Sequence, residues 1–122
     1  MGNVARTITI ERRRKFAGSA INFFIVLNLE RSELERNVGM RALSAESQFL
    51  RESKQVFPLS NGEKITIKTM DASNRFFVVA FTSDGSLFSQ SILVDDQDFD
   101  ARYSVTLKLG FFKNQFIIEK VV

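Results

Sequence analysis

Three acidic side chains, Asp96, Asp98 and Asp100, stand at alternate positions of one short segment. Carboxylates at this spacing open calcium-binding loops, which also carry Gly at the sixth position and a bidentate Glu at the twelfth. Those two positions hold Ala101 and Leu107 here. The segment is therefore a partial match to a cation or carbohydrate site. We interpret it as a solvated acidic turn, because carboxylates are common in turns, and we expect no bound metal.

A run of basic side chains offers a second kind of chemistry. Arg12, Arg13, Arg14 and Lys15 are consecutive and could contact the phosphates of nucleic acid or of anionic lipids. The chain as a whole has 17 Lys and Arg against 14 Asp and Glu, a net charge of +3. These charges are interspersed, whereas nucleic-acid binders more often show a basic face. We therefore favour a solvated strand end and keep an anionic partner as the alternative.

Ordinary catalytic groups are missing from the composition. The chain has no His and no Cys, which removes the commonest proton-transfer group at neutral pH and all thiolate chemistry. A Ser nucleophile would need Lys as its base, and no Ser-x-x-Lys sequence occurs. Glycoside hydrolysis needs two carboxylates across a cleft, and no sequence spacing pairs two of them. We predict no enzyme activity, no catalytic residues and no cofactor.

These side chains must be positioned by strands. Residues 4–11 alternate, with Ile8 and Ile10 on one side, which predicts a half-buried strand. The unbroken apolar runs 23–27 and 76–81 predict strands buried on both faces. With the remaining short alternating runs and their turn signals, the sequence predicts about eight strands.

Two local features interrupt this pattern. Residues 30–55 are rich in Glu, Arg, Ser, Ala and Leu; Ser32 and Glu35 can form a capping box, and Leu34 and Val38 share a helical face. This predicts a helical insertion near residues 31–54 that packs on a sheet, or else a partner-binding arm. Asn61-Gly62 predicts a hairpin with a type I′ turn.

The fold class follows from these elements. We predict an all-β protein: a single β-sandwich, or partly open barrel, of about eight antiparallel strands with the short helical insertion. The chain has 122 residues, 44% of them hydrophobic, and includes 13 Phe, enough to fill one core. No repeat or linker divides it, so we predict one domain over residues 1–122.

Three motifs resemble those of a known group. Ile8-Thr9-Ile10-Glu11-Arg12, Phe16-Ala17-Gly18-Ser19-Ala20 and Leu59-Ser60-Asn61-Gly62-Glu63 resemble the strand ends and turns of small bacterial β-sandwich domains of unknown function. The resemblance covers nearly the whole chain except residues 30–55. This sequence departs from the group in two ways. It contains the helical insertion, and it lacks a Gly-x-His step before the strand that begins at Phe76. The resemblance implies a compact sandwich and no catalytic residues.

The apolar run 16–29, which follows the basic residues, imitates a targeting signal. It begins far from Met1, contains Ser19, Asn22 and Asn28, and is shorter than the ~20 residues of a membrane span. We therefore expect an internal strand, no transmembrane segment and a cytoplasmic protein.

These exclusions leave binding as the expected role. We predict a non-enzymatic binding or scaffolding domain whose partner is a protein or a second copy, with a homodimer as one form. The expected contact is a sheet edge or the helical insertion, because an exposed edge offers unpaired backbone groups. The alternatives are an anionic polymer held by the basic run, and a carbohydrate-binding or carboxylate-based hydrolytic site.

Overall fold

The computed structural model describes residues 5–14, 21–38, 55–82, 85–110 and 114–121. The elements in this part of the chain are β1 Arg6–Arg12, β2 Phe23–Leu27, α1 Arg31–Val38, β3 Val56–Leu59, β4 Lys64–Thr69, β5 Asn74–Thr82, β6 Gly85–Phe88, β7 Ile92–Val94, β8 Asp100–Lys108 and β9 Gln115–Lys120. None of the helical structure described here is long and apolar enough to cross a membrane.

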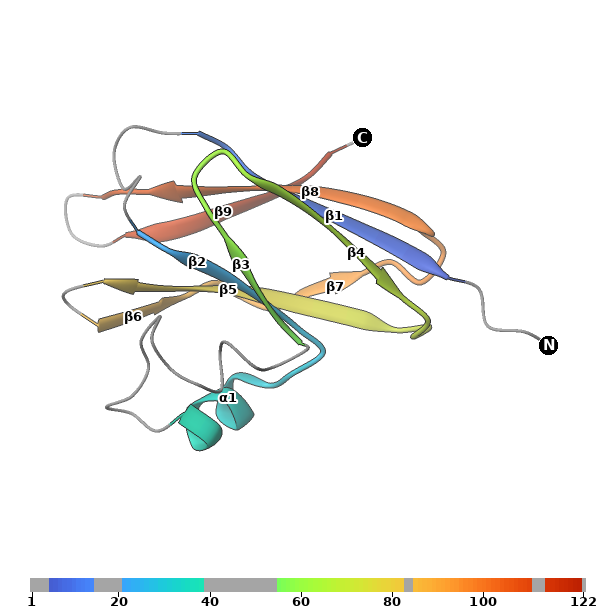
Figure 1. Cartoon of the computed structure of the whole chain (residues 1–122), viewed down its shortest axis with the longest axis horizontal. Coiled ribbons are helices and arrows are strands. Elements are labelled where there is room, and N and C mark those ends of the chain that lie inside the picture. Colours follow the sequence, from blue (N-terminus) through green and yellow to red (C-terminus); the bar gives the residue numbers. More distant parts are fainter. Residues whose placement is uncertain (1–4, 15–20, 39–54, 83–84, 111–113, 122) are drawn as a thin grey trace.

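The strands form two sheets that stack face to face (Figure 1). Sheet A has the order β4-β1-β8-β9, and sheet B has the order β3-β2-β5-β6, with β7 also pairing with β5. Because no strand is shared between the sheets in the described residues, the fold is a β-sandwich rather than a closed barrel. The predicted all-β class is confirmed.

One pair of strands corrects the prediction that all neighbours are antiparallel. Strands β1 and β8 run parallel, with Thr7 beside Asp100 and Arg12 beside Val105. A parallel pair needs a long connection, and here that connection includes the whole of sheet B. The direction of this pair depends on strands far apart in the sequence, so local alternation could not predict it.

The Asn-Gly turn also differs from the prediction. Strands β3 and β4 flank it, but β3 pairs with β2 in sheet B and β4 pairs with β1 in sheet A. Gly62 has a φ of 78°, Asn61 has no positive φ, and the Glu63 N–H donates to the Ser60 carbonyl at 2.9 Å. Positive φ at the third position alone is the type II pattern, not type I′. The turn carries the chain from one sheet to the other instead of closing a hairpin.

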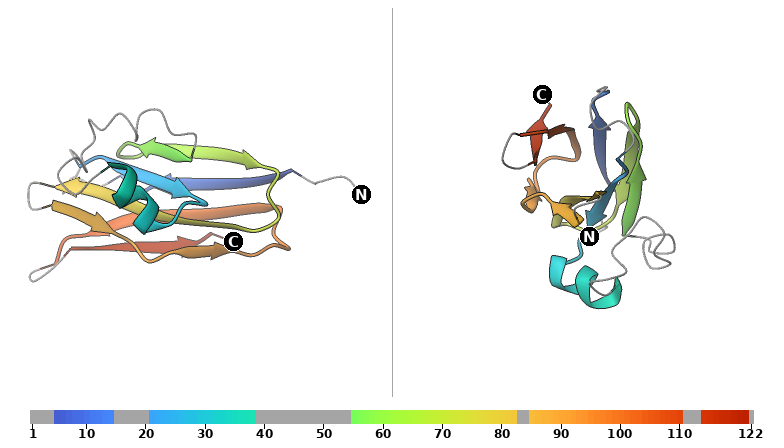
Figure 2. Two further views of the ribbon diagram at one scale, coloured as in Figure 1. Left: turned by 90° about the horizontal axis from the view of Figure 1, so that it is seen from below. Right: turned by 90° about the vertical axis from the view of Figure 1, so that its left-hand side faces the viewer.

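The main core lies between the sheets, and a second apolar cluster lies on the outer face of sheet B. That second cluster contains Phe24, Val26, Phe77 and Val79, and α1 contributes Leu34, which is fully buried. Figure 2 shows α1 against this side of the molecule. The predicted helix is therefore present over Arg31–Val38 and packs on a sheet; residues 39–54 lie outside the described part.

Candidate functional site

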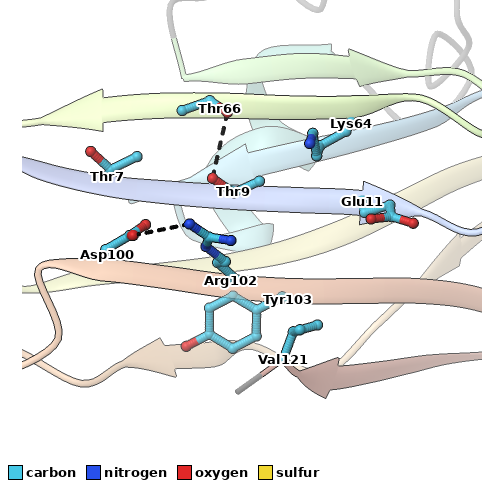
Figure 3. A pocket seen from close by; sticks show the side chains of 9 residues that line it. All are labelled: Thr7, Thr9, Glu11, Lys64, Thr66, Asp100, Arg102, Tyr103 and Val121. Carbon is cyan, nitrogen blue, oxygen red and sulfur yellow. Dashed lines mark hydrogen bonds and ion pairs between the residues drawn. The ribbon is translucent and has the colours of Figure 1, made fainter.

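The outer face of sheet A carries a shallow polar hollow of about 450 Å³ (Figure 3). Nine residues from strands β1, β4 and β8 and from the segment after β9 line it. They are Thr7, Thr9, Glu11, Lys64, Thr66, Asp100, Arg102, Tyr103 and Val121. The Tyr103 side chain is itself 5% exposed and packs its ring edge-on against Phe76 at 5.1 Å. Its burial also raises the pKa of the Tyr103 hydroxyl.

Strand alternation explains why this face is polar. Ile8 and Ile10 of β1 point into the core, so Thr9 between them points outward. The Thr9 hydroxyl lies 3.4 Å from that of Thr66 on β4. On its other side Thr9 stands beside Arg102 of β8, in the register of the parallel pair β1 and β8. The hollow therefore combines hydroxyls and charges from strands distant in the sequence.

The two carboxylates of the hollow lie far apart along the sheet. Glu11 stands beside Ser104, whereas Asp100 stands beside Thr7, four residues back along β1. At the rise of a strand this is about 13 Å, which exceeds the ~5–9.5 Å between the carboxyl groups of glycosidases. Asp100 is also paired with Arg102 at 3.3 Å. The hydroxyls and charges of this face can form hydrogen bonds, and the spacing of its two carboxylates does not suit the two-carboxylate mechanism of glycosidases.

The predicted cation or carbohydrate residues before and at the start of β8 do not converge. Asp98 accepts a hydrogen bond from the Asp100 N–H at 3.2 Å and pairs with Lys120 at 2.9 Å, while Asp100 pairs with Arg102 instead. Asp96 is exposed, and its carbonyl accepts a hydrogen bond from Arg6 at 3.1 Å. Within the described residues no three carboxylates gather to hold a metal ion.

The ion pair between Asp98 and Lys120 ties this acidic segment to the end of β9. The hydrogen bond from Lys120 lowers the pKa of the Asp98 carboxyl, and the same contact raises the pKa of the Lys120 ammonium. Both groups are therefore charged near neutral pH. Their contact joins the end of β9 to the turn before β8.

The residues of the basic run, 12–15, do not all lie at the surface. Arg12 is only 3% exposed: its guanidinium lies 3.6 Å from the centre of the Phe23 ring and donates to the Leu59 carbonyl at 3.0 Å. Its burial lowers the pKa of Arg12. Arg13 and Arg14 are exposed, and Lys15 lies outside the described residues. Because Arg12 faces the interior, it is not available to a phosphate, and an anionic-partner patch would rest on its neighbours.

The edges of the sheets differ in how well they are protected against another strand. Edge strand β3 of sheet B carries the exposed Pro58, which has no N–H to donate. Edge strand β4 of sheet A carries the exposed Lys64 and Lys68, and lysines discourage edge pairing. The opposite edge of sheet A is β9, whose centre is the half-buried apolar run 116–118. Edge β9 has no such protection along that run.

The backbone direction along β9 follows from its pairing with β8. The Val121 N–H donates to the Arg102 carbonyl at 2.8 Å, and the register continues with Glu119 opposite Ser104. In an antiparallel pair, hydrogen-bonded residues alternate. The backbone groups of Ile117 therefore face β8, while those of Phe116 and Ile118 face away from it. Strand β6 of sheet B lies close to β9, but it does not pair with it.

The sequence predicts contact through a sheet edge but not which edge, and it does not predict the hollow. The outward row Thr7, Thr9 and Glu11 could be read from the alternation of β1, but its neighbours in β8 depend on the parallel pairing. The place of β9 at the end of sheet A likewise depends on all the other pairings. The signal available in the sequence was the apolar run 116–118, flanked by charged residues on one side only.

Comparisons with known proteins give distant likenesses. No family model and no curated protein matches the chain. A crystal structure of the human-specific toxin intermedilysin is similar at 8% identity and a TM-score of 0.47, over 98% of this chain and 24% of that one. A structure described as a trapped toxin is similar at 9% identity and a TM-score of 0.45, over 96% and 24%. The chain thus spans about a quarter of the length of each.

Proposed function

We propose that this chain is a non-enzymatic binding module that takes an extended strand of a protein partner along β9. The observation that carries the proposal is the edge of β9: in the described part of the chain no strand pairs with its outward side, and its apolar centre contains no Pro or Lys. Addition of a strand to such an edge is a recurring mode of peptide recognition. The other predicted contact, the helical insertion, is less suited in its described part, since Leu34 and Arg31 of α1 already pack against sheet B.

The edge supplies both affinity and some selectivity. Each backbone hydrogen bond to the added strand contributes a net ~0.5–1.5 kcal/mol. Side chains of that strand alternate between the two faces of sheet A. One set lies beside Ile117 on the outer face, and the other lies beside Phe116 and Ile118 at the rim of the core. We therefore expect an extended partner segment with apolar side chains at its centre.

The substitution Ile117→Lys tests this edge. It places a charge at the centre of β9 but leaves the backbone bonds of residue 117 to β8 in place. The matched control is Thr66→Lys on β4, the other edge of the same sheet, because Thr66 also points to the outer face. Peptides selected from a random display library on the unaltered chain should bind Thr66→Lys equally well. They should bind Ile117→Lys at least ~10-fold more weakly, a loss of ~1.4 kcal/mol or more, since the centre of the edge loses an apolar contact and gains a lysine, which discourages edge pairing.

Two results would speak against the proposal. One is a selected set of peptides that binds Ile117→Lys as tightly as the unaltered chain. The other is a larger loss in Thr66→Lys, which would move the site to β4 and its neighbours. Circular dichroism of both variants establishes that each retains the sandwich before binding is compared.

A further inference from the structure

We infer that the strand that pairs with β9 is β9 of a second copy of this chain, antiparallel to the first about a two-fold axis at Ile117. This inference rests on the proposed function and gives it a partner. It follows from which residues of β9 face outward and from which side chains each possible register would place opposite one another.

Backbone geometry allows few registers. Outward-facing groups belong to Phe116, Ile118 and Lys120, because Ile117 and Glu119 bond to β8. A two-fold antiparallel pair forms its ladder only if outward residues stand opposite outward residues. The two-fold axis must therefore pass beside one residue of β9, which then faces the same residue of the second copy. Each register is named by that residue.

The side chains then distinguish these registers. An axis at Glu119 or at Lys120 sets like charges directly opposite each other, which is unfavourable. An axis at Ile118 sets Lys120 opposite Phe116 and Glu119 opposite Ile117. An axis at Phe116 sets amide side chains opposite Ile117 and Ile118. Each of these four choices mismatches charge or polarity across the pair.

The axis at Ile117 matches each pair between Asn114 and Lys120. Ile117 faces its own copy, and Phe116 faces Ile118 of the second copy. Gln115 then stands opposite Glu119, and Asn114 stands opposite Lys120, so each charged group meets an amide. This self-complementarity of charge and polarity is the reason for choosing a second copy over an unrelated strand.

The paired copies would join their A sheets into one continuous sheet. Sheet A ends at β9, and Val121 after β9 lines the hollow, so the two hollows would lie on one shared face, on either side of the axis. The contact comprises a single strand of six residues from each copy. Interfaces below ~1,200 Å² are typical of weak complexes, so we expect an association that depends on concentration.

Disulfide trapping tests the register, and the chain is well suited to it because it has no cysteine. Ile117 and its copy form a non-hydrogen-bonded pair, with Cα atoms about 4.5 Å apart. This lies within the ~4.4–6.8 Å that a disulfide spans. Ile117→Cys should therefore give a covalent dimer under mild oxidation. The matched control, Glu119→Cys, places its two thiols about 13 Å apart along the strands and should give at least fivefold less dimer.

Light scattering of the unaltered chain over a range of concentrations provides the second measurement. Its mass should rise toward that of a dimer, and Ile117→Lys should remain monomeric. Equal trapping of the two cysteine variants would overturn the register. No trapping of either, together with a monomeric mass at every concentration, would overturn self-pairing. In that second case, peptides that bind the unaltered chain and fail on Ile117→Lys would leave the proposed function standing without this partner.

Discussion

Replacing Phe23 with alanine is expected to lower the free energy of unfolding by about 3–5 kcal/mol, the usual cost of deleting a buried Phe side chain. Phe23 is 1% exposed and belongs to β2 in sheet B. Its ring contacts Phe116 of β9 edge-on, with ring centres 5.0 Å apart, and carries the Arg12 guanidinium on its face. One side chain thus joins sheet B to the two strands of sheet A that carry those residues.

Urea denaturation measures this effect, and Phe99→Ala is the control. Phe99 is 45% exposed, with Arg6 over its ring at 4.7 Å, so its loss should cost no more than ~1 kcal/mol. A comparable loss in the two variants would show that Phe23 does not occupy the centre of the core. Because Phe116 is on β9, Phe23→Ala should also weaken binding at that edge.

The second large effect is expected from Arg12→Ala, at about 1–3 kcal/mol for the loss of a charged hydrogen bond and of the buried part of the side chain. The Leu59 carbonyl loses the Arg12 donor and keeps the Phe23 N–H of the β2–β3 pair, and the Phe23 ring loses the side chain that covers it. Removing a guanidinium from the interior offsets part of this cost, because its burial is itself unfavourable. For that reason we expect a smaller effect than for Phe23→Ala.

The neighbouring Arg13→Ala is a close control, because it deletes the same side chain one residue along. Arg13 is exposed, so its substitution should change the free energy of unfolding by no more than ~0.5 kcal/mol. Thermal or urea unfolding of the two variants side by side decides the matter. Equal stability of Arg12→Ala and Arg13→Ala would contradict an interior position for Arg12.

Local pattern predicted much of the fold correctly. Ile8 and Ile10 are buried as their alternation indicates, and all of Phe23–Leu27 is buried on both faces, because the core covers one face and Leu34 packs in the cluster on the other. Arg12 was predicted at the surface because of its charge. It has the same parity as Ile8 and Ile10, so the pattern that placed them inside also placed Arg12 there.

What the sequence could not predict is non-local. The parallel pairing of β1 with β8 and the passage of the chain between sheets at Gly62 depend on which strands meet, and no residue type encodes that by itself. The hollow and the open edge of β9 both follow from those pairings. Of the residues that the sequence singled out, Asp100 lines the hollow, and the binding roles of the basic run and of the acidic segment stay predictions.

Residue-resolved hydrogen exchange along β9 tests most directly whether this edge is where a second strand pairs. In dilute solution the Ile117 and Glu119 amides should exchange slowly, because they face β8, while those of Phe116 and Ile118 should exchange fast. At concentrations where light scattering detects dimer, or with a selected peptide bound, the Phe116 and Ile118 amides should become protected. If these two amides continued to exchange fast in the complex, the partner would lie elsewhere and the account would be wrong.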